Sequence, residues 1–242
     1  MSLLAALQVG PGDVVSLVGG GGKTSLALRL VSEATGAGLR AVFTTTTRIW
    51  PPDMPTVFAG EELPGVWPCC VAGDLQDDGK LSGLRPGAVA ELLAQPDRRA
   101  GADLVVVEAD GSGGRPLKFP LAHEPVIPAC TTLVLPVAGA VVVGKPFTPD
   151  WVHRCASAMA FVGGGGHVTP EHVARLLWHP DAATRGRPAG ARVVPVINQA
   201  ETCPEAARAV GRVLLREGAP RVLLTAARST APVLQQLTRE GA

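Results

Sequence analysis

Residues 14–25 read Val-Val-Ser-Leu-Val-Gly-Gly-Gly-Gly-Lys-Thr-Ser. The β-branched run predicts a strand over residues 14–18, and the apolar spacing that follows predicts a helix over residues 24–34. Residues 39–44 form a second apolar run of strand length. A strand, a helix and a second strand in this order form a βαβ unit, which implies a parallel sheet and a right-handed crossover. The fold class is therefore α/β.

The rest of the chain continues this alternation. Residues 51–100 break into short pieces around an Asp77-Asp78-Gly79 turn, which predicts an inserted subregion with a small hairpin. Along the chain the pattern predicts strands at 56–58, 104–107, 133–135, 193–197 and 221–224, and helices at 86–94, 149–161, 170–178, 204–216 and 231–239. We expect one P-loop NTPase-like domain over residues 1–242, with a doubly wound, mostly parallel sheet and helices on both faces.

The loop between the first strand and the first helix resembles a phosphate-binding P-loop. It consists of Gly19, Gly20, Gly21, Gly22, Lys23, Thr24 and Ser25. Loop N–H groups and the positive end of a helix bind phosphate oxygens, lysine reaches the β- and γ-phosphates, and threonine binds Mg²⁺. The strict motif has a further upstream glycine, so this loop is short, as in ATP-dependent Mur-type ligases. The alternative is a glycine-rich turn with a chance Lys-Thr pair. We expect ATP or GTP to bind here with Mg²⁺.

Four threonines and an arginine, residues 44–48, end the second predicted strand. They are open to two interpretations. β-Branched residues are common in strands of every kind. However, the end of a strand beside the P-loop strand faces the triphosphate in a doubly wound sheet. In that case Thr46 and Arg48 are candidates for contact with phosphate, metal or substrate.

Acidic residues follow the buried strand at 104–107. Glu108 and Asp110 have the layout of a Walker B site, in which a carboxylate binds Mg²⁺ or orients an attacking water. An acid after an apolar strand is also a common coincidence. Because a glycine-rich segment with Arg115 and Lys118 follows, we expect Glu108, Asp110 and Lys118 to be catalytic and Arg115 to bind an anion. The predicted metal ligands are Thr24, Glu108 and Asp110.

Asn198 follows the strand predicted at 193–197. In GTPases an Asn-Lys-x-Asp sequence after a strand reads guanine, but here the sequence is Asn-Gln-Ala-Glu. We therefore expect Asn198 to lie near the base without strong guanine selectivity, and ATP is slightly favoured.

The composition excludes several function classes. The 22 basic and 21 acidic residues give a net charge of +1, so the chain has no electrostatic basis for binding nucleic acid or an anionic membrane. No apolar run reaches the roughly 20 residues of a membrane-spanning helix, and the start of the chain lacks a secretory layout. We expect a cytoplasmic protein with its five cysteines reduced. His and Cys do not follow zinc spacing, and His123 and His153 remain unassigned polar candidates.

Several motifs together resemble the YqeC family. They are GGGGKTS at 19–25, TTTTRI at 44–49, EADGSGGRPLKFP at 108–120, HEPVIP at 123–128, GKP at 144–146, HR at 153–154 and NQAE at 198–201. Members are described as accessory proteins of selenium-dependent molybdenum hydroxylases or as selenium cofactor biosynthesis proteins. The resemblance spans about residues 14–228 and implies a role in maturing or inserting the cofactor of such a hydroxylase.

Three functions fit these observations. The first is an NTPase that assists maturation of a molybdenum hydroxylase. The second is a small-molecule kinase or ATP-dependent ligase, with Arg115, Lys118 and His123 holding the acceptor. The third is a nucleotide-gated binding module with little turnover.

Overall fold

The computed structural model describes residues 1–93 and 101–239. Among these residues the helices are α1 (Leu3–Leu7), α2 (Lys23–Gly36), α3 (Cys155–Val162), α4 (Pro170–Trp178) and α5 (Pro204–Arg216), with 3₁₀ helices η1 (Pro86–Leu92) and η2 (Ala140–Val142). The strands of the main sheet are β1 (Val14–Gly19), β2 (Ala41–Thr45), β4 (Thr56–Phe58), β5 (Cys69–Ala72), β7 (Leu104–Glu108), β9 (Leu133–Gly139), β11 (Arg192–Val193), β12 (Val196–Asn198), β13 (Arg221–Thr225) and β14 (Val233–Thr238).

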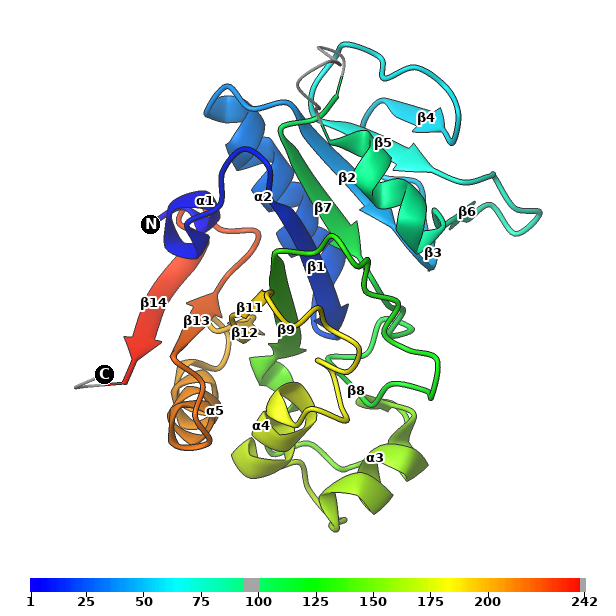
Figure 1. Ribbon diagram of the computed structural model, residues 1–242. Helices are drawn as coiled ribbons and strands as arrows, with labels where there is room; N and C mark the ends of the chain where they lie inside the picture. The colour runs from blue at the N-terminus through cyan, green and yellow to red at the C-terminus, as the bar shows by residue number, and fades with distance from the viewer. Residues whose placement is uncertain (94–100, 240–242) are drawn as a thin grey trace.

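The main sheet runs in the order β14-β13-β12-β9-β1-β7-β2-β5-β4, and β11 pairs with β9. Every pairing in it is parallel except that of β13 with β14. The glycine-loop strand β1 lies in the interior of this sheet, between β7 and β9 (Figure 1). The predicted α/β class and mostly parallel sheet are confirmed.

Alternate residues of each central strand enter two separate cores, because successive side chains of a strand point to opposite faces. On one face, Val15 and Leu17 of β1 pack in a cluster with residues of α1 and α2. On the other face, Val14 and Val18 pack with residues of α4 and α5. Helices therefore cover both faces of the sheet, and the central strands are buried throughout, as a parallel sheet requires.

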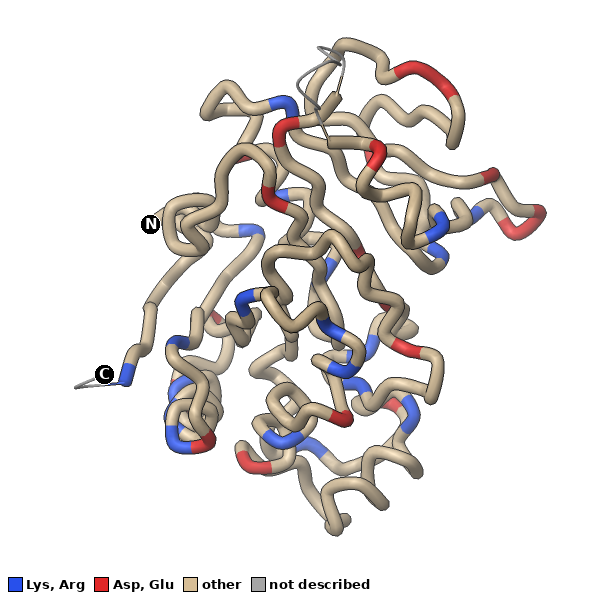
Figure 2. The backbone as a smooth tube through the Cα atoms, viewed as in Figure 1, with Lys and Arg blue, Asp and Glu red and all other residues tan. Residues whose placement is uncertain are grey.

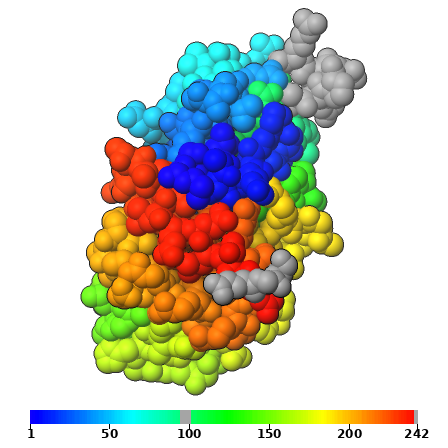
Figure 3. Space-filling model, turned by 90° about the vertical axis from the view of Figure 1, so that its left-hand side faces the viewer, coloured from blue at the N-terminus to red at the C-terminus, as the bar shows by residue number. Residues whose placement is uncertain are grey.

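Helix α1 near the N-terminus packs beside the C-terminal strand β14. Val233 N–H donates to the Met1 carbonyl at 3.3 Å, and the Arg221 guanidinium donates to the carbonyl oxygens of Ala6 and Leu7. In Figure 3 the blue N-terminal helix α1 lies directly against the red C-terminal segment. These contacts lie at the β13–β14 edge of the main sheet, whereas the glycine loop follows β1 in the interior of the sheet.

The region at 51–93 does two things. Strands β4 and β5 extend the main sheet beyond β2 as parallel strands. The predicted turn at Asp77-Asp78-Gly79 is present, since Gln76 N–H donates to the Lys80 carbonyl across it at 2.7 Å. Beyond the turn, β6 (Leu81–Ser82) pairs antiparallel with β3 (Arg48–Ile49), forming a two-stranded ribbon beside the sheet. Figure 2 shows both signs of charge at this turn.

Two helix predictions are wrong. The segment at 231–239 is the edge strand β14, held by its pairing with β13. The helix predicted at 149–161 begins only at Cys155, because Arg154 adopts a φ of 62° that no α-helix accommodates, and residues 152–153 form β10, which pairs with β8 (Leu117–Lys118). In place of the helix predicted at 86–94 the structure has the 3₁₀ helix η1, which ends at Leu92, and residue 94 of the prediction lies outside the described residues.

Within the described residues, no helix is both long and apolar enough to cross a bilayer.

Candidate functional site

The glycine loop connects the buried end of β1 to the first turn of α2. Strand β1 ends at Gly19 and helix α2 begins at Lys23. The N–H groups of Lys23, Thr24 and Ser25 precede the first helical hydrogen bond, which Leu26 N–H makes to the Gly22 carbonyl at 3.1 Å. Together with the helix dipole, these N–H groups form an anion-binding end.

The loop itself is held by protein backbone. Gly20 N–H donates to the Val137 carbonyl at 2.9 Å, and Gly21 N–H donates to the Arg115 carbonyl at 3.1 Å. A Cβ on Gly21 would lie 2.1 Å from the Gly139 nitrogen, and Gly21 has a φ of +76°. Only glycine fits this position, because the backbone of β9 leaves no room for a side chain. The loop is therefore fixed before any ligand binds.

Lys23 lies under this loop and is almost fully buried, with 3% exposed. Its Nζ donates to the Gly19 carbonyl at 2.6 Å and lies 3.3 Å from Asp110 Oδ1 and 3.7 Å from Glu108 Oε1. A buried ammonium needs such partners because desolvation of an unpaired charge is costly. The lysine of the loop is thus positioned against two carboxylates that come from the end of β7.

Thr24 and Glu108 meet although 84 residues separate them in sequence. The Thr24 hydroxyl donates to Glu108 Oε2 at 2.7 Å. Burial raises the pKa of Glu108, and the Lys23 ammonium and the Thr24 hydroxyl oppose this rise. The register of the sheet sets the position, because Glu108 lies opposite Leu17 of β1 and Thr45 of β2 at the carboxyl edge.

This pair fits a magnesium ion. Mg²⁺ takes oxygen ligands, binds one or two protein groups and completes its shell with waters and substrate phosphates. Thr24 and Glu108 supply two neighbouring oxygens at the mouth of the loop. The described residues contain no group of three or more His, Cys, Asp or Glu that could enclose a metal alone. The donor set is therefore suited to a metal that arrives with phosphate.

Asp110 and Lys118, two of the three residues expected to be catalytic, lie beneath the loop and outside the cavity wall. Both oxygens of Asp110 accept from Gly19 N–H at 3.0 Å. The Lys118 side chain is fully buried, 3.3 Å from Asp110, 2.8 Å from Glu124 and 2.6 Å from the Gly111 carbonyl. These contacts position the loop. Of the three predicted metal ligands, Thr24 and Glu108 line the cavity and Asp110 does not.

The threonine run divides into structural and cavity-facing parts. Thr44 and Thr45 are buried and donate to the carbonyls of Val71 and Glu108. The Thr46 hydroxyl donates to the Val126 carbonyl at 2.7 Å, away from the cavity. Of residues 44–48 only Arg48 lines the cavity. The positions of the threonines therefore fit ordinary β-branched strand residues, and the position of the arginine fits contact with a ligand.

The side chains of Arg115 and Asn198 also donate hydrogen bonds to backbone carbonyls. The Arg115 guanidinium donates to the Pro149 and Gly113 carbonyls at 2.8 Å. The Asn198 amide donates to the Gly21 carbonyl at 2.9 Å. Neither side chain belongs to the cavity wall. The following residue does, since Gln199 lines the cavity and its Oε1 is buried without a hydrogen-bond partner among the described residues.

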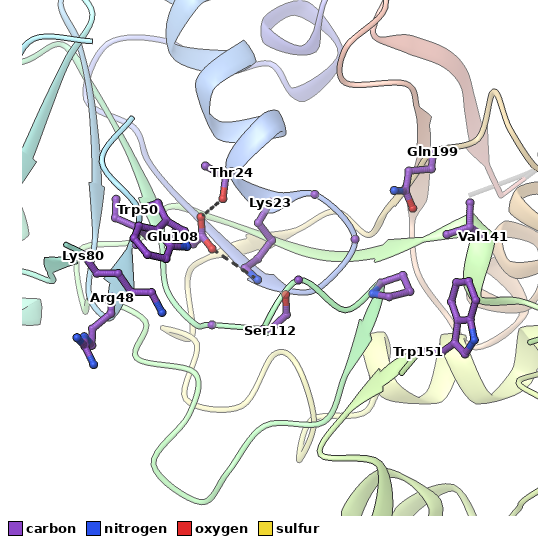
Figure 4. A pocket seen from close by; sticks show the side chains of 17 residues that line it. Lys23, Thr24, Arg48, Trp50, Lys80, Glu108, Ser112, Val141, Trp151 and Gln199 are labelled. Atoms are coloured by element: carbon purple, nitrogen blue, oxygen red, sulfur yellow. Dashed lines mark hydrogen bonds and ion pairs between the residues drawn. The ribbon is translucent and has the colours of Figure 1, made fainter. Parts of the chain in front are cut away.

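A cavity of about 870 Å³ lies over the loop. Its middle is formed by residues 21–24, Glu108 and residues 111–114. One end is formed by Arg48, Ile49, Trp50 and Lys80, and the other by Pro116, Val141, Trp151 and Gln199. In Figure 4 the Lys23, Thr24 and Glu108 side chains lie between these two ends. The cavity therefore spans the carboxyl end of β1, with one end over β2 and the other over β9 and β12.

Sequence reasoning missed Trp50, Lys80, Trp151 and Gln199 as cavity residues. Trp50 and Trp151 lie far apart in the sequence and belong to no motif, and Lys80 directly follows the predicted Asp77-Asp78-Gly79 turn. The sequence did offer a signal for Gln199, since it follows Asn198 at a predicted strand end. In the structure its φ of 59° is an unusual backbone conformation for a non-glycine residue.

The remaining polar candidates do not reach the cavity. His123 is exposed on a loop, and His153 lies near Gly113 with its pKa lowered by burial and by the neighbouring Arg154 and Lys118. All five cysteines are free thiols. Burial raises the pKa of Cys69 to about 11 and that of Cys70 to about 12, so these two stay protonated at neutral pH.

Comparison with known proteins gives one consistent result. The profile of the YqeC protein family matches residues 15–156. An uncharacterized protein YqeC of Escherichia coli K12 is 33% identical over 210 residues, which cover 80% of this chain and 78% of that protein. No solved structure matches. The matched region contains the glycine loop, Glu108 and Lys118, and the chain belongs to the YqeC family.

Proposed function

We propose that this protein binds a nucleoside triphosphate with Mg²⁺ at the glycine loop and hydrolyses it, within a P-loop NTPase-like fold. The observation that carries the proposal is the Thr24–Glu108 hydrogen bond of 2.7 Å beside the Lys23 ammonium. A loop hydroxyl and a strand-end carboxylate are the two protein groups that P-loop enzymes place around magnesium.

Each group has a separate role in this proposal. The N–H groups of the first turn of α2 bind phosphate oxygens, and Lys23 moves its ammonium toward the β- and γ-phosphates. Thr24 and Glu108 would hold Mg²⁺, which would supply positive charge beside the β- and γ-phosphates. Glu108 also orients the attacking water. Asp110 keeps Gly19 in place and is a positioning residue.

The base occupies the end of the cavity at Val141, Trp151 and Gln199. An apolar wall, an aromatic ring and one unpaired amide oxygen suit a neutral heterocycle that donates a hydrogen bond. Gln199 and Glu201 stand where the guanine-reading sequence has lysine and aspartate, so a GTP preference above roughly a hundredfold, or about 2.7 kcal/mol, would contradict the proposal. The family description implies that turnover assists cofactor maturation or insertion for a selenium-dependent molybdenum hydroxylase.

Calorimetry with ATP and GTP, with and without Mg²⁺, tests binding. Thr24→Ala is expected to abolish the dependence of affinity on Mg²⁺. Thr35→Ala is the matched control and keeps this dependence, because its hydroxyl lies on the same helix and has no hydrogen-bond partner among the described residues. Equal Mg²⁺ dependence in both variants contradicts the metal assignment.

Phosphate release tests turnover. Glu108→Gln is expected to lose release while retaining triphosphate binding, and Glu171→Gln in the first turn of α4 serves as the control. Absence of release from the wild type, with triphosphate tightly bound, would favour a nucleotide-gated binding module. Absence of triphosphate binding would remove the proposal altogether.

A further inference from the structure

The cavity end opposite the base end is built by three side chains from two distant segments. Arg48 begins the short strand β3, Trp50 follows it, and Lys80 precedes β6. The antiparallel pairing of Ile49 with Leu81 brings them together. We call Arg48, Trp50 and Lys80 the ribbon cluster.

Trp50 in the ribbon cluster is unusually exposed. Its relative exposure is 65%, and no other aromatic residue is among the large hydrophobic residues exposed in the described chain. Lys80 Nζ lies 5.1 Å from the ring centroid, within cation–π range. Arg48 Nη2 lies 2.6 Å from Asp78 Oδ1, and this exposed pair restrains the guanidinium at the cavity rim. A large ring left open beside two cations is a surface suited to stacking with a planar ligand.

The charge of the cavity wall favours an anion at this end. The wall contains three cations, Lys23, Arg48 and Lys80, and one carboxylate, Glu108. Two of the wall cations belong to the ribbon cluster, where Arg48 is paired with Asp78, whereas the base end has no charged wall residue and Lys145 lies behind it, over the Trp151 ring. Both ends therefore have a tryptophan, but the wall of one bears an amide and the wall of the other bears two cations.

The cavity has room for a second molecule. Its volume of about 870 Å³ lies near the top of the range of roughly 300–1,000 Å³ for small-molecule sites. Figure 4 shows Thr24 and Glu108 between the loop lysine and Trp50, so the proposed metal and γ-phosphate position faces the ribbon cluster.

We propose that the ribbon cluster is a subsite for a planar heteroaromatic compound that carries a phosphate group. Trp50 stacks on the ring, and Arg48 and Lys80 bind the phosphate. This inference rests on the proposed function for its orientation, because the triphosphate occupies the middle and the neutral end of the same cavity. If the protein is a kinase or a ligase, this subsite is where its second substrate binds. The residues that hold that substrate then differ from Arg115, Lys118 and His123.

Flavin mononucleotide is a suitable probe, because its own fluorescence is quenched when its ring stacks on tryptophan. Titration is done with Mg²⁺ and a saturating non-hydrolysable ATP analogue, so that the triphosphate position is filled. Riboflavin, which lacks the phosphate, and inorganic phosphate, which lacks the ring, are compared with it, and GMP and CMP compete as smaller ring phosphates. We expect flavin mononucleotide to bind at least tenfold more tightly than riboflavin or phosphate.

Variants identify the subsite. Trp50→Ala and Lys80→Ala are each expected to weaken flavin mononucleotide binding at least fivefold. Arg208→Ala, which removes an exposed arginine that pairs with Glu205 on α5, is the control and leaves it unchanged. Unchanged binding in Trp50→Ala, or failure of flavin mononucleotide, GMP and CMP all to bind, overturns the subsite.

A separate measurement distinguishes this inference from the proposed function. Lys23→Ala removes the loop ammonium but no member of the ribbon cluster. Flavin mononucleotide binding that persists in Lys23→Ala and remains sensitive to Trp50→Ala supports the subsite even if the wild type fails to bind triphosphate. The subsite is overturned if the ATP analogue displaces flavin mononucleotide and if Gln199→Ala, and not Trp50→Ala, weakens its binding. That result assigns the probe to the base end of the cavity.

Discussion

The side-chain amide of Asn198 donates to the carbonyl oxygen of Gly21 at 2.9 Å, joining the end of β12 to the glycine loop. The other side of the same amide accepts from the Thr225 hydroxyl and from Ala227 N–H, both at 3.1 Å. Both acceptor positions of the Asn198 amide oxygen are thus used by protein, and one of its two N–H groups donates to the loop. It supports the loop from the side, and Gln199 is left to meet a base.

Asn198→Ala should therefore weaken ATP and GTP binding by the same factor. Loss of the amide leaves the Gly21 carbonyl without its donor, and one buried hydrogen bond of this kind corresponds to about 1–2 kcal/mol, or roughly tenfold in affinity. Thr225→Val removes only the contact on the far side of the amide and should have a smaller effect. Calorimetry with both nucleotides checks this, and a change in the ATP-to-GTP ratio would mean that Asn198 touches the base.

Gly21→Ala and Gly38→Ala form a matched pair that separates strain from collision. Both glycines have positive φ, +76° and +87°, but nothing lies within 4 Å of a Cβ on Gly38. Gly38→Ala should cost about 1–2 kcal/mol of unfolding free energy and leave nucleotide affinity intact. Gly21→Ala should abolish nucleotide binding because its Cβ would displace β9. Comparable binding in the two variants would contradict the tight seating of the loop.

Lys118→Ala should destabilise the fold. The substitution leaves Asp110 and Glu124 without the ammonium that lies 3.3 and 2.8 Å from them. Breaking a buried ion pair costs about 3–5 kcal/mol, which lowers the Tm of a chain of this size by roughly 6–20 °C. Lys145→Ala, at an exposed lysine beside Trp151, is the comparison and should leave the Tm nearly unchanged. Equal melting temperatures of Lys118→Ala and the wild type would mean that Lys118 has no structural role. The prediction that Lys118 is catalytic would then be favoured again.

Asp103 should make stability depend on pH. Hydrogen bonds from Arg40 lower its pKa from 3.8, with burial opposing them. A lowered pKa contributes stability above the unfolded value, and this contribution is lost as the pH falls through the folded value. Asp103→Asn should therefore cost about 1–2 kcal/mol equally at pH 7 and pH 5, and the difference from wild type should shrink below pH 3.8. Urea unfolding at pH 7, 5 and 3 measures it, with exposed Asp53→Asn as control.

The sequence predicts the centre of the molecule better than its edges. The strand before the glycine loop and the helix after it have local signals, namely a β-branched run and a 3–4-residue apolar spacing, and both are where the pattern indicates. The segment at 231–239 has helix-forming leucine and glutamine, and only the open edge of β13 makes it a strand. Local propensity is weak where a neighbouring strand offers a complete row of backbone partners.

The residues of the candidate site also divide into those with a local sequence signal and those placed only by tertiary structure. Lys23, Thr24 and Glu108 can be found from sequence because each is tied to a strand end or a helix start. Trp50 and Lys80 cannot, because only the pairing of β3 with β6 brings them to one rim. The burial of Lys118 is likewise a tertiary property, since its motif gives no sign that Glu124 and Asp110 both turn toward it.

The seating of the glycine loop has a consequence for the thermodynamics of binding. Since the loop backbone is already held by β9, by the Arg115 carbonyl and by Asn198, its conformational entropy is lost when the chain folds and not when a ligand arrives. Phosphate binding should then proceed with little ordering of the loop, and hydrogen exchange at Gly20 and Gly21 should be slow in the free protein as well as in the complex. Any slow conformational step would lie elsewhere, at the outer side of the β3–β6 ribbon, where Arg48 and Trp50 are exposed.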